Sequence, residues 1–244
     1  MISTKQYLEI IDRFYKALKD LEERLGGTKK LAKCHGRMGW PERGIYFFFE
    51  SGERRSNDSG SRVVRVGTNA LRRGSRITFW NRLRAHRGLI RGRRIGGGNH
   101  RNSVFRLHVG TAILRKDGLE GAYPTWGVGS SAKKGIRNIE HPIEKRVSKY
   151  IASMPFLWLE SNDSYGPNSE RAYIVRNSLA LLSNYGKLGT PLAIDSPSEG
   201  WLGHYCASKR VRESGLWNSG HISINRIDLD FINIFEMKIE KWRP

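Results

Sequence analysis

Cysteine is scarce in this sequence of 244 residues, and its scarcity excludes two kinds of stabilising site. The two cysteines, Cys34 and Cys206, lie far apart, and neither belongs to a CxxC motif. Such a pair offers neither a disulfide framework nor the ligand spacing of a zinc site. Free thiols are typical of reducing compartments, so the sequence predicts a cytoplasmic protein with both cysteines reduced.

Long hydrophobic runs are also missing. No stretch approaches the roughly 18 apolar residues that a membrane-spanning helix requires. The first residues, Met1 to Gln6, open an amphipathic helix pattern and lack the features of a signal peptide. We therefore expect no membrane among the partners of this chain.

Acidic residues are few compared with basic ones. Lysine and arginine total 43 against 23 aspartates and glutamates, which gives a formal net charge of +20. An excess of this size produces self-repulsion that a polyanionic partner relieves. Nucleic acid is the first expectation and is preferred over an anionic membrane surface, the second candidate that the charge allows. A basic ribosomal-type protein is the unspecific alternative.

Hydrophobic periodicity predicts the elements along the chain. Apolar residues recur at steps of three and four from Leu8 to Leu25, which predicts an amphipathic helix capped by Ser3 or Thr4. Residues 103–114 fit either a strand or a short helix. The other predicted elements are a basic loop over 29–43, strands over 44–50, 62–66 and 156–159, helices over 78–86, 139–154 and 170–184, and a folded extension over 191–244.

The most distinctive pattern lies between Gly44 and His86. The triplet Gly-Ile-Tyr ends at Tyr46 on the first strand, a Val-Gly-Thr sequence ends the second strand, and Arg82 and His86 share one helix face. A guanidinium suits bidentate contact with a phosphate. The plain alternatives are a core tyrosine between aromatic residues and a solvated basic helix face.

This pattern resembles the GIY-YIG nuclease family, in its restriction-endonuclease branch or in a bacterial subgroup with a C-terminal extension. The resemblance implies an α+β fold with a small mixed β-sheet flanked by helices. It divides the chain into an N-terminal helix and basic loop (1–43), a nuclease core (44–190), and a C-terminal extension packed on the core (191–244).

The resemblance also implies roles for individual residues. Tyr46 would act as general base or position the attacking water. Arg82 would hold the scissile phosphate, and His86 would assist proton transfer or bind the phosphate. Arg65 occupies the place of the tyrosine in the second half of the family motif, so a two-tyrosine mechanism is not expected. As a catalytic residue, Arg65 would instead hold charge or a phosphate at that place.

Two placements compete for the metal ligand that the resemblance implies. The family uses a glutamate to hold Mg²⁺ or Mn²⁺, and such hard cations require oxygen ligands. Glu144 is a carboxylate in a suitable helix, although an acid at a helix start also serves the helix dipole. The alternative equates 170–184 with the family's glutamate helix, where Val175 would replace the acid and the protein would be catalytically impaired.

Contacts to DNA are expected mainly from the loop that is rich in glycine and arginine. Glycines allow close approach of the backbone to phosphates, and arginines reach phosphates or guanine edges. A mobile surface loop is the plain alternative. The predicted DNA-binding residues are Arg84, Arg91, Arg93, Arg94, His100, Arg101 and Asn177.

The sequence therefore predicts a metal-dependent endonuclease that hydrolyses phosphodiester bonds of double-stranded DNA. A restriction or phage-defence role is the narrower prediction, with the chain acting as a homodimer or beside a partner subunit of a defence system. The alternative from another functional class is a non-catalytic DNA-binding protein that keeps the nuclease fold.

Overall fold

The sheet at the centre of the molecule has four strands, and every strand pairing is antiparallel in the described residues, 3–224 and 226–243 of the computed structural model. Strands β2 (Gly44–Arg54) and β3 (Ser61–Thr68) form a hairpin, and β4 (Pro155–Glu160) pairs with the other edge of β2. The short strand β1 (Lys29–Lys30) extends the sheet, so the order is β1-β4-β2-β3. The α+β class with a small sheet is confirmed, whereas the expectation of a mixed sheet is wrong.

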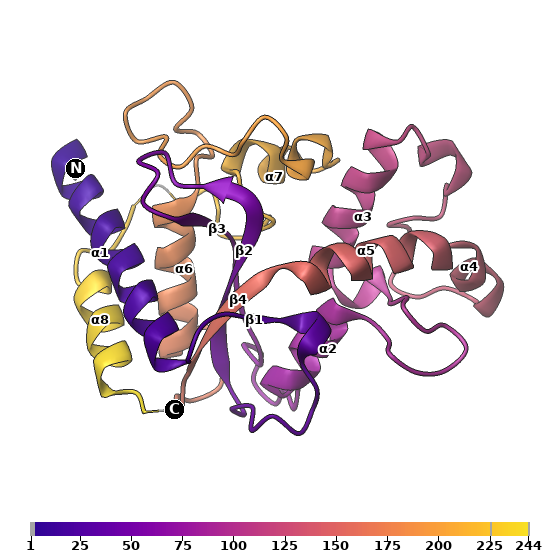
Figure 1. The fold of residues 1–244 in the computed structure, drawn as a ribbon, viewed down its shortest axis with the longest axis horizontal. Helices are drawn as coiled ribbons and strands as arrows, with labels where there is room; N and C mark the ends of the chain where they lie inside the picture. The colour runs from indigo at the N-terminus through magenta and orange to yellow at the C-terminus, as the bar shows by residue number, and fades with distance from the viewer. Residues whose placement is uncertain (1–2, 225, 244) are drawn as a thin grey trace.

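Helices cover both faces of this sheet (Figure 1). One face carries α1, α6 and α8, and the other carries α2, α3 and α5, with α4 beside α5 and away from the sheet. The bounds are α1 Thr4–Arg24, α2 Phe79–Arg87, α3 Val104–Lys116, α4 Lys134–Ile139, α5 His141–Ser153, α6 Glu170–Leu182, α7 Lys209–Ser214 and α8 Phe231–Lys241.

Alternation along β2 separates two hydrophobic clusters. Ile45 and Phe47 pack with α1, α6 and α8, whereas Tyr46 and Phe48 pack with α2, α3 and α5. Successive side chains of a strand point to opposite faces, so this follows directly from the sequence GIYFFF. Tyr46 therefore lies in a different layer from its two neighbours, as predicted.

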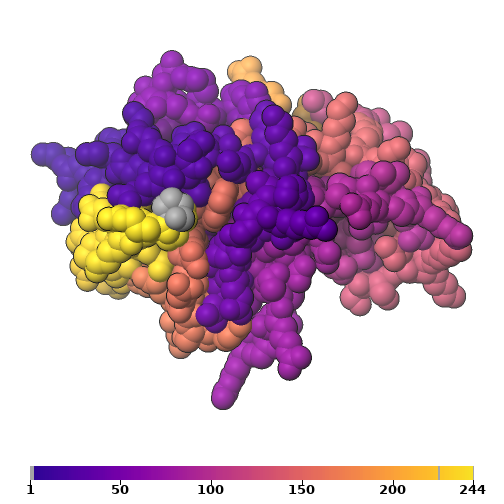
Figure 2. All heavy atoms as spheres, turned by 60° about the horizontal axis from the view of Figure 1, so that its bottom comes forward, coloured from indigo at the N-terminus to yellow at the C-terminus, as the bar shows by residue number. Residues whose placement is uncertain are grey.

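The N-terminal helix forms as its pattern predicts. Ser3 caps it and exchanges hydrogen bonds with Gln6 in a capping box. The buried stripe packs against α8, and Figure 2 shows the two helices together on one flank with the segments from α2 to α5 on the other. Leu8 departs from the expected stripe because its side chain is exposed.

Residues 103–114, which fitted either element type, form α3. Ser103 begins the helix by accepting a hydrogen bond from the backbone N–H of Arg106 at 3.2 Å. The helix is buried on most of its circumference, and this hides the helical period in the sequence.

The C-terminal extension packs on both faces of the sheet. Trp217 donates its backbone N–H to Val64 O at 2.7 Å, and the indole N–H groups of Trp217 and Trp201 both bond to Glu50. Both tryptophans are buried, so they are core residues rather than surfaces for stacking bases. Within the described residues, no helix is both long and apolar enough to cross a membrane.

Candidate active site

The tyrosine of β2 and the histidine of α2 meet directly. The hydroxyl of Tyr46 lies 2.9 Å from Nε2 of His86, and the two share a hydrogen bond. Helix α2 begins at its cap Thr78 and buries Phe79 and Leu83, which directs His86 towards β2. Arg82, one turn before His86, is near enough to affect the pKa of both Tyr46 and His86.

The far side of the His86 ring is held by a serine that the sequence patterns did not single out. Nδ1 of His86 lies 2.7 Å from Oγ of Ser103. Ser103 is buried and also caps α3, so its position is fixed by the start of that helix. A serine followed by a helical segment is a capping signal, and recognising residues 103–114 as a helix would have identified it.

The charges around Tyr46 favour its phenolate form. Burial alone would raise the pKa of the Tyr46 hydroxyl, but the guanidinium groups of Arg82 and Arg65 outweigh burial and lower that pKa below its ordinary value. Arg65, which takes the place of the tyrosine in the second half of the family motif, therefore acts electrostatically on Tyr46.

The histidine is kept neutral. Burial, reinforced by the positive charges of Arg82, Arg65 and Arg106, lowers the pKa of His86 well below its ordinary value. A neutral imidazole has one ring nitrogen without a proton. The lowered pKa disfavours a charged imidazolium, so His86 acts on Tyr46 as a neutral hydrogen-bond partner.

Arg65 is itself anchored inside the protein. Its Nη1 donates to the backbone carbonyl of Trp217, and its guanidinium carbon lies 4.5 Å from the ring centroid of Phe105. Its Nε has no hydrogen-bond partner in the described part of the chain. Burial lowers the pKa of the Arg65 guanidinium, and Tyr46 opposes that shift.

The four groups differ in exposure. Tyr46 and His86 are 0% exposed and Arg65 is 5% exposed, whereas Arg82 is half-buried. Arg82 is therefore the most exposed of the four groups.

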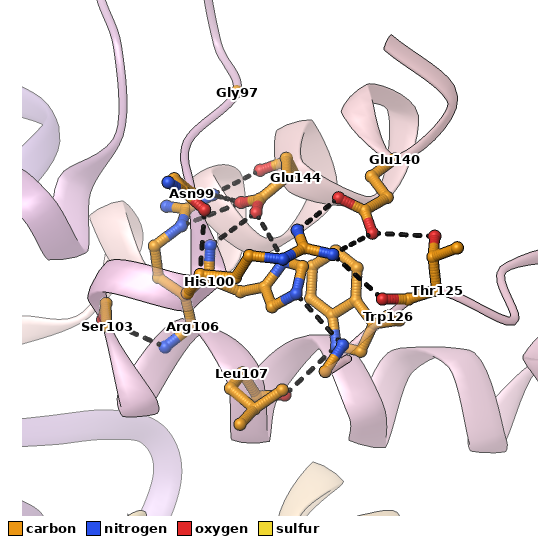
Figure 3. Close-up of polar contacts among 12 residues, drawn as sticks. Gly97, Asn99, His100, Ser103, Arg106, Leu107, Thr125, Trp126, Glu140 and Glu144 are labelled. Atoms are coloured by element: carbon orange, nitrogen blue, oxygen red, sulfur yellow. Dashed lines mark hydrogen bonds and ion pairs between the residues drawn. The ribbon is translucent and has the colours of Figure 1, made fainter. Parts of the chain in front are cut away.

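The carboxylate of Glu144 is fully occupied by internal partners, as Figure 3 shows. One oxygen accepts the backbone N–H of His100 at 2.7 Å and lies 3.0 Å from Nδ1 of the same histidine. The other accepts two hydrogen bonds from Arg106, one of them from Nε at 2.9 Å. Burial would raise the pKa of Glu144, but His100 and Arg106 outweigh it and lower that pKa.

This arrangement does not fit a divalent cation at Glu144. A carboxylate oxygen has two lone pairs, and all four of Glu144 face hydrogen-bond donors or a ring nitrogen. Among the residues that the structure describes, no three His, Cys, Asp or Glu side chains gather as a metal-binding group. Glu144 instead links α5 to Arg106 of α3 and to the backbone N–H of His100, which precedes α3.

Two residues predicted to touch DNA are interior residues. His100 is buried, stacks on Trp126 with ring centroids 3.9 Å apart, and accepts the backbone N–H of Gly127 at Nε2 (Figure 3). The side chain of Arg101 is 2% exposed and pairs with Glu140. Both side chains already have internal partners, so the structure does not support them as DNA contacts.

Val175 and Asn177 lie on the opposite side of the sheet from Tyr46. Val175 packs in the hydrophobic cluster with α1 and α8. Asn177 is buried, donates to Tyr173 O and accepts the backbone N–H of Asp228. The structure therefore places Val175 away from Tyr46 and gives Asn177 internal partners, and it supports neither Val175 as the position of a lost metal ligand nor Asn177 as a DNA contact.

The remaining predicted DNA contacts are open to solvent to different degrees. Arg84, Arg91 and Arg93 are exposed, and Arg94 is half-buried with hydrogen bonds to Asn138 and Lys134 O. A cavity of about 690 Å³ borders α2 on the side of Arg84.

Comparison with known proteins identifies the family of the chain. Residues 5–244 match the GIY-YIG domain family, which covers nearly the whole chain. No curated protein and no solved structure matches the chain significantly. The matched residues include the Gly-Ile-Tyr triplet, the strand that ends in Val-Gly-Thr and the Arg-x-x-x-His helix. The chain belongs to the GIY-YIG nuclease family.

Proposed function

We propose that this protein is a DNA endonuclease whose chemistry centres on the Tyr46–His86 hydrogen bond. Family membership supports a nuclease acting on DNA. The single observation that carries the residue assignment is a phenol 2.9 Å from a neutral imidazole, with Arg65 and Arg82 favouring loss of the phenol proton.

In the proposed mechanism, Tyr46 has lost its proton to solvent and is held as the phenolate that Arg65 and Arg82 favour, while neutral His86 donates Nε2–H to it and accepts the Ser103 hydroxyl at Nδ1. The phenolate then accepts a proton from the attacking water, or orients that water. Arg82 binds the non-bridging oxygens of the scissile phosphate and stabilises the charge that grows on them. Arg65 keeps the phenolate stable from inside the protein.

A requirement for Mg²⁺ or Mn²⁺ is a separate proposal that rests on the family alone. Because the residues present do not fit a cation at Glu144, no step of the mechanism above passes through a metal. Cleavage in Mg²⁺, Mn²⁺ and EDTA checks this requirement directly.

The test of the main proposal is cleavage of supercoiled plasmid by wild type and by Tyr46→Phe, His86→Ala and Arg82→Ala. Each variant should lose roughly 10²-fold or more in rate, as expected for loss of a general acid–base or electrostatic group. Arg54→Ala is the matched control, because Arg54 is an exposed hairpin arginine. A wild type that cuts while all three variants cut equally fast would refute the site.

A second candidate is a DNA-binding protein without nuclease activity. The occupied carboxylate of Glu144 and the full burial of Tyr46 favour it. Salt-sensitive DNA binding in EDTA, with no cutting in Mg²⁺ or Mn²⁺, would support this candidate over the enzyme.

A restriction or phage-defence role is a narrower proposal that depends on the endonuclease proposal. Sequencing the ends of cleaved DNA would reveal a fixed recognition sequence if the enzyme is of restriction type. Sedimentation of the protein with and without DNA would distinguish a homodimer from a monomer that awaits a partner subunit.

A further inference from the structure

Two adjoining cavities form a trough on the α2–α5 flank, across α2 from His86. The larger, of about 690 Å³, lies between α2, His35 and the start and end of the glycine-rich loop, residues 88–91 and 98–102. The smaller, of about 530 Å³, lies between that loop and α4. Arg137 borders both cavities, so we call them together the Arg137 trough.

The lining of the Arg137 trough carries positive charge and no carboxylate among the residues described. Its cations are Arg84, Arg87, Arg91, Arg93, Arg94, Lys134 and Arg137. The sequence contributes to this excess, because no acidic residue occurs between Asp58 and Asp117. Cations gathered in a concave surface raise the local concentration of an anionic ligand.

Most of these cations have no internal partner for their charge. No side-chain hydrogen bond or ion pair within the described residues involves Arg84, Arg91, Arg93 or Arg137. Arg87 is buried, bonds to Cys34 O and lies over Trp80, yet its Nε has no partner in the part of the chain described. The contrast with Arg101 and Arg106, which both pair with glutamates, indicates that the trough is left open for an outside anion.

The wall that carries these arginines is held in one shape. The loop is closed where Leu89 N donates to Gly97 O at 2.7 Å and Gly96 N donates to Leu89 O at 2.8 Å. A side chain at Gly98 would collide with the guanidinium of Arg106, whose partner is Glu144. The occupied Glu144 therefore has a role here, because it fixes the base of the loop that presents Arg91 and Arg93.

The trough is separate from the chemical centre. Arg82 and Arg84 are two residues apart on α2, which places their side chains about 200° apart around the helix. Arg82 faces Tyr46 and lowers its pKa, whereas Arg84 lines the trough. A DNA segment bound in the trough would therefore lie beside the segment that is cut.

We propose that the Arg137 trough binds the phosphate backbone of duplex DNA flanking the cleaved bond, and supplies affinity without taking part in the chemistry. This inference rests on the proposed function for the position of the cut. Phosphates are the ligand class that unpaired guanidinium groups recognise best, and such contacts carry most of the affinity of DNA-binding proteins.

The test is a triple variant, Arg91→Gln with Arg93→Gln and Arg137→Gln, compared with Lys5→Gln, Lys16→Gln and Lys19→Gln. The control removes the same charge from exposed positions of α1, on the other face of the sheet. Binding is measured by fluorescence anisotropy in EDTA with a fluorescent duplex at several salt concentrations. Loss of three phosphate contacts should reduce the slope of log K against log salt by about 2–3, with little change in the control.

Two further readouts separate this inference from the endonuclease proposal. In the trough variant, the hydroxyl-radical footprint should retreat on one side of the cut, and the rate at saturating DNA should remain at the wild-type value. Equal slopes in wild type and trough variant, or an equal loss in the lysine control, would overturn the inference. A wild type that binds but never cuts would refute the nuclease assignment while the salt slope still tests the trough.

Discussion

The ring of Tyr46 lies over Gly67, its antiparallel partner in β3. A Cβ built at Gly67 would lie 2.6 Å from Cε2 of Tyr46 and closer still to its hydroxyl. Position 67 must therefore be glycine because the ring of Tyr46 occupies the space that a side chain would need. No side chain fits at position 67 unless the phenol leaves its place beside His86.

Gly67→Ala should consequently displace Tyr46 and abolish cleavage. Forcing a methyl group into this packed layer should also lower the free energy of unfolding by about 1–3 kcal/mol. Gly135→Ala is the control, because a Cβ there meets nothing within 4 Å. Plasmid cleavage and urea unfolding measure the two effects, and a fully active Gly67→Ala protein would contradict the proposed placement of the phenol.

Arg65→Gln should move the pH dependence of cleavage to higher pH. The positive charge of Arg65 helps to lower the pKa of Tyr46, so removing it raises that pKa and leaves less phenolate at neutral pH. The rate should then fall at pH 7 and recover as the pH rises. Cleavage rates measured from pH 6 to about 10 would show the shift; an unchanged profile with a uniformly lower rate would indicate a purely structural role for Arg65.

Glu144→Gln should chiefly destabilise the fold. It leaves the buried guanidinium of Arg106 without its counter-charge, and breaking a buried pair costs on the order of 3–5 kcal/mol. Because the pKa of Glu144 is lowered in the folded state, its contribution is present above the unfolded pKa of about 4.5 and is lost as the pH falls below it.

Urea unfolding of the Glu144→Gln protein at pH 7 provides the measurement, and calorimetry with Mn²⁺ provides its counterpart. If Glu144 were a metal ligand, the Glu144→Gln protein would keep wild-type stability and lose Mn²⁺ binding, and this result would contradict the prediction.

Val175→Glu should not create activity. The side chain would place a carboxylate in the hydrophobic cluster between α1, α6 and α8, at a cost of roughly 3 kcal/mol or more. Val175→Ile, which adds only one methylene, is the comparison. Thermal unfolding measures the cost, and a stable Val175→Glu protein that cuts faster than wild type would restore the lost-acid interpretation.

The motif residues were predictable because their geometry is local. Alternation along GIYFFF directs Tyr46 to one face, and a helical turn brings Arg82 and His86 to the same side. Ser103 was missed, because the helix it caps is buried on most sides and lacks a clear apolar stripe. The direction of the strands was also missed, because pairing between distant segments does not follow from periodicity.

By itself, the sequence determined the family, the α+β class and the strand–strand–helix order that carries Tyr46, Arg65, Arg82 and His86. Only the tertiary structure decided which polar side chains are available. His100 and Arg106 reach Glu144 across 44 and 38 residues of chain, and that pairing removes a carboxylate and two basic groups from any site. Within the described residues, Arg84, Arg91, Arg93 and Arg137 form no ion pair, because folding brings no carboxylate to the lining of the trough. Such partners are chosen by packing between distant segments, which local patterns in a sequence do not encode.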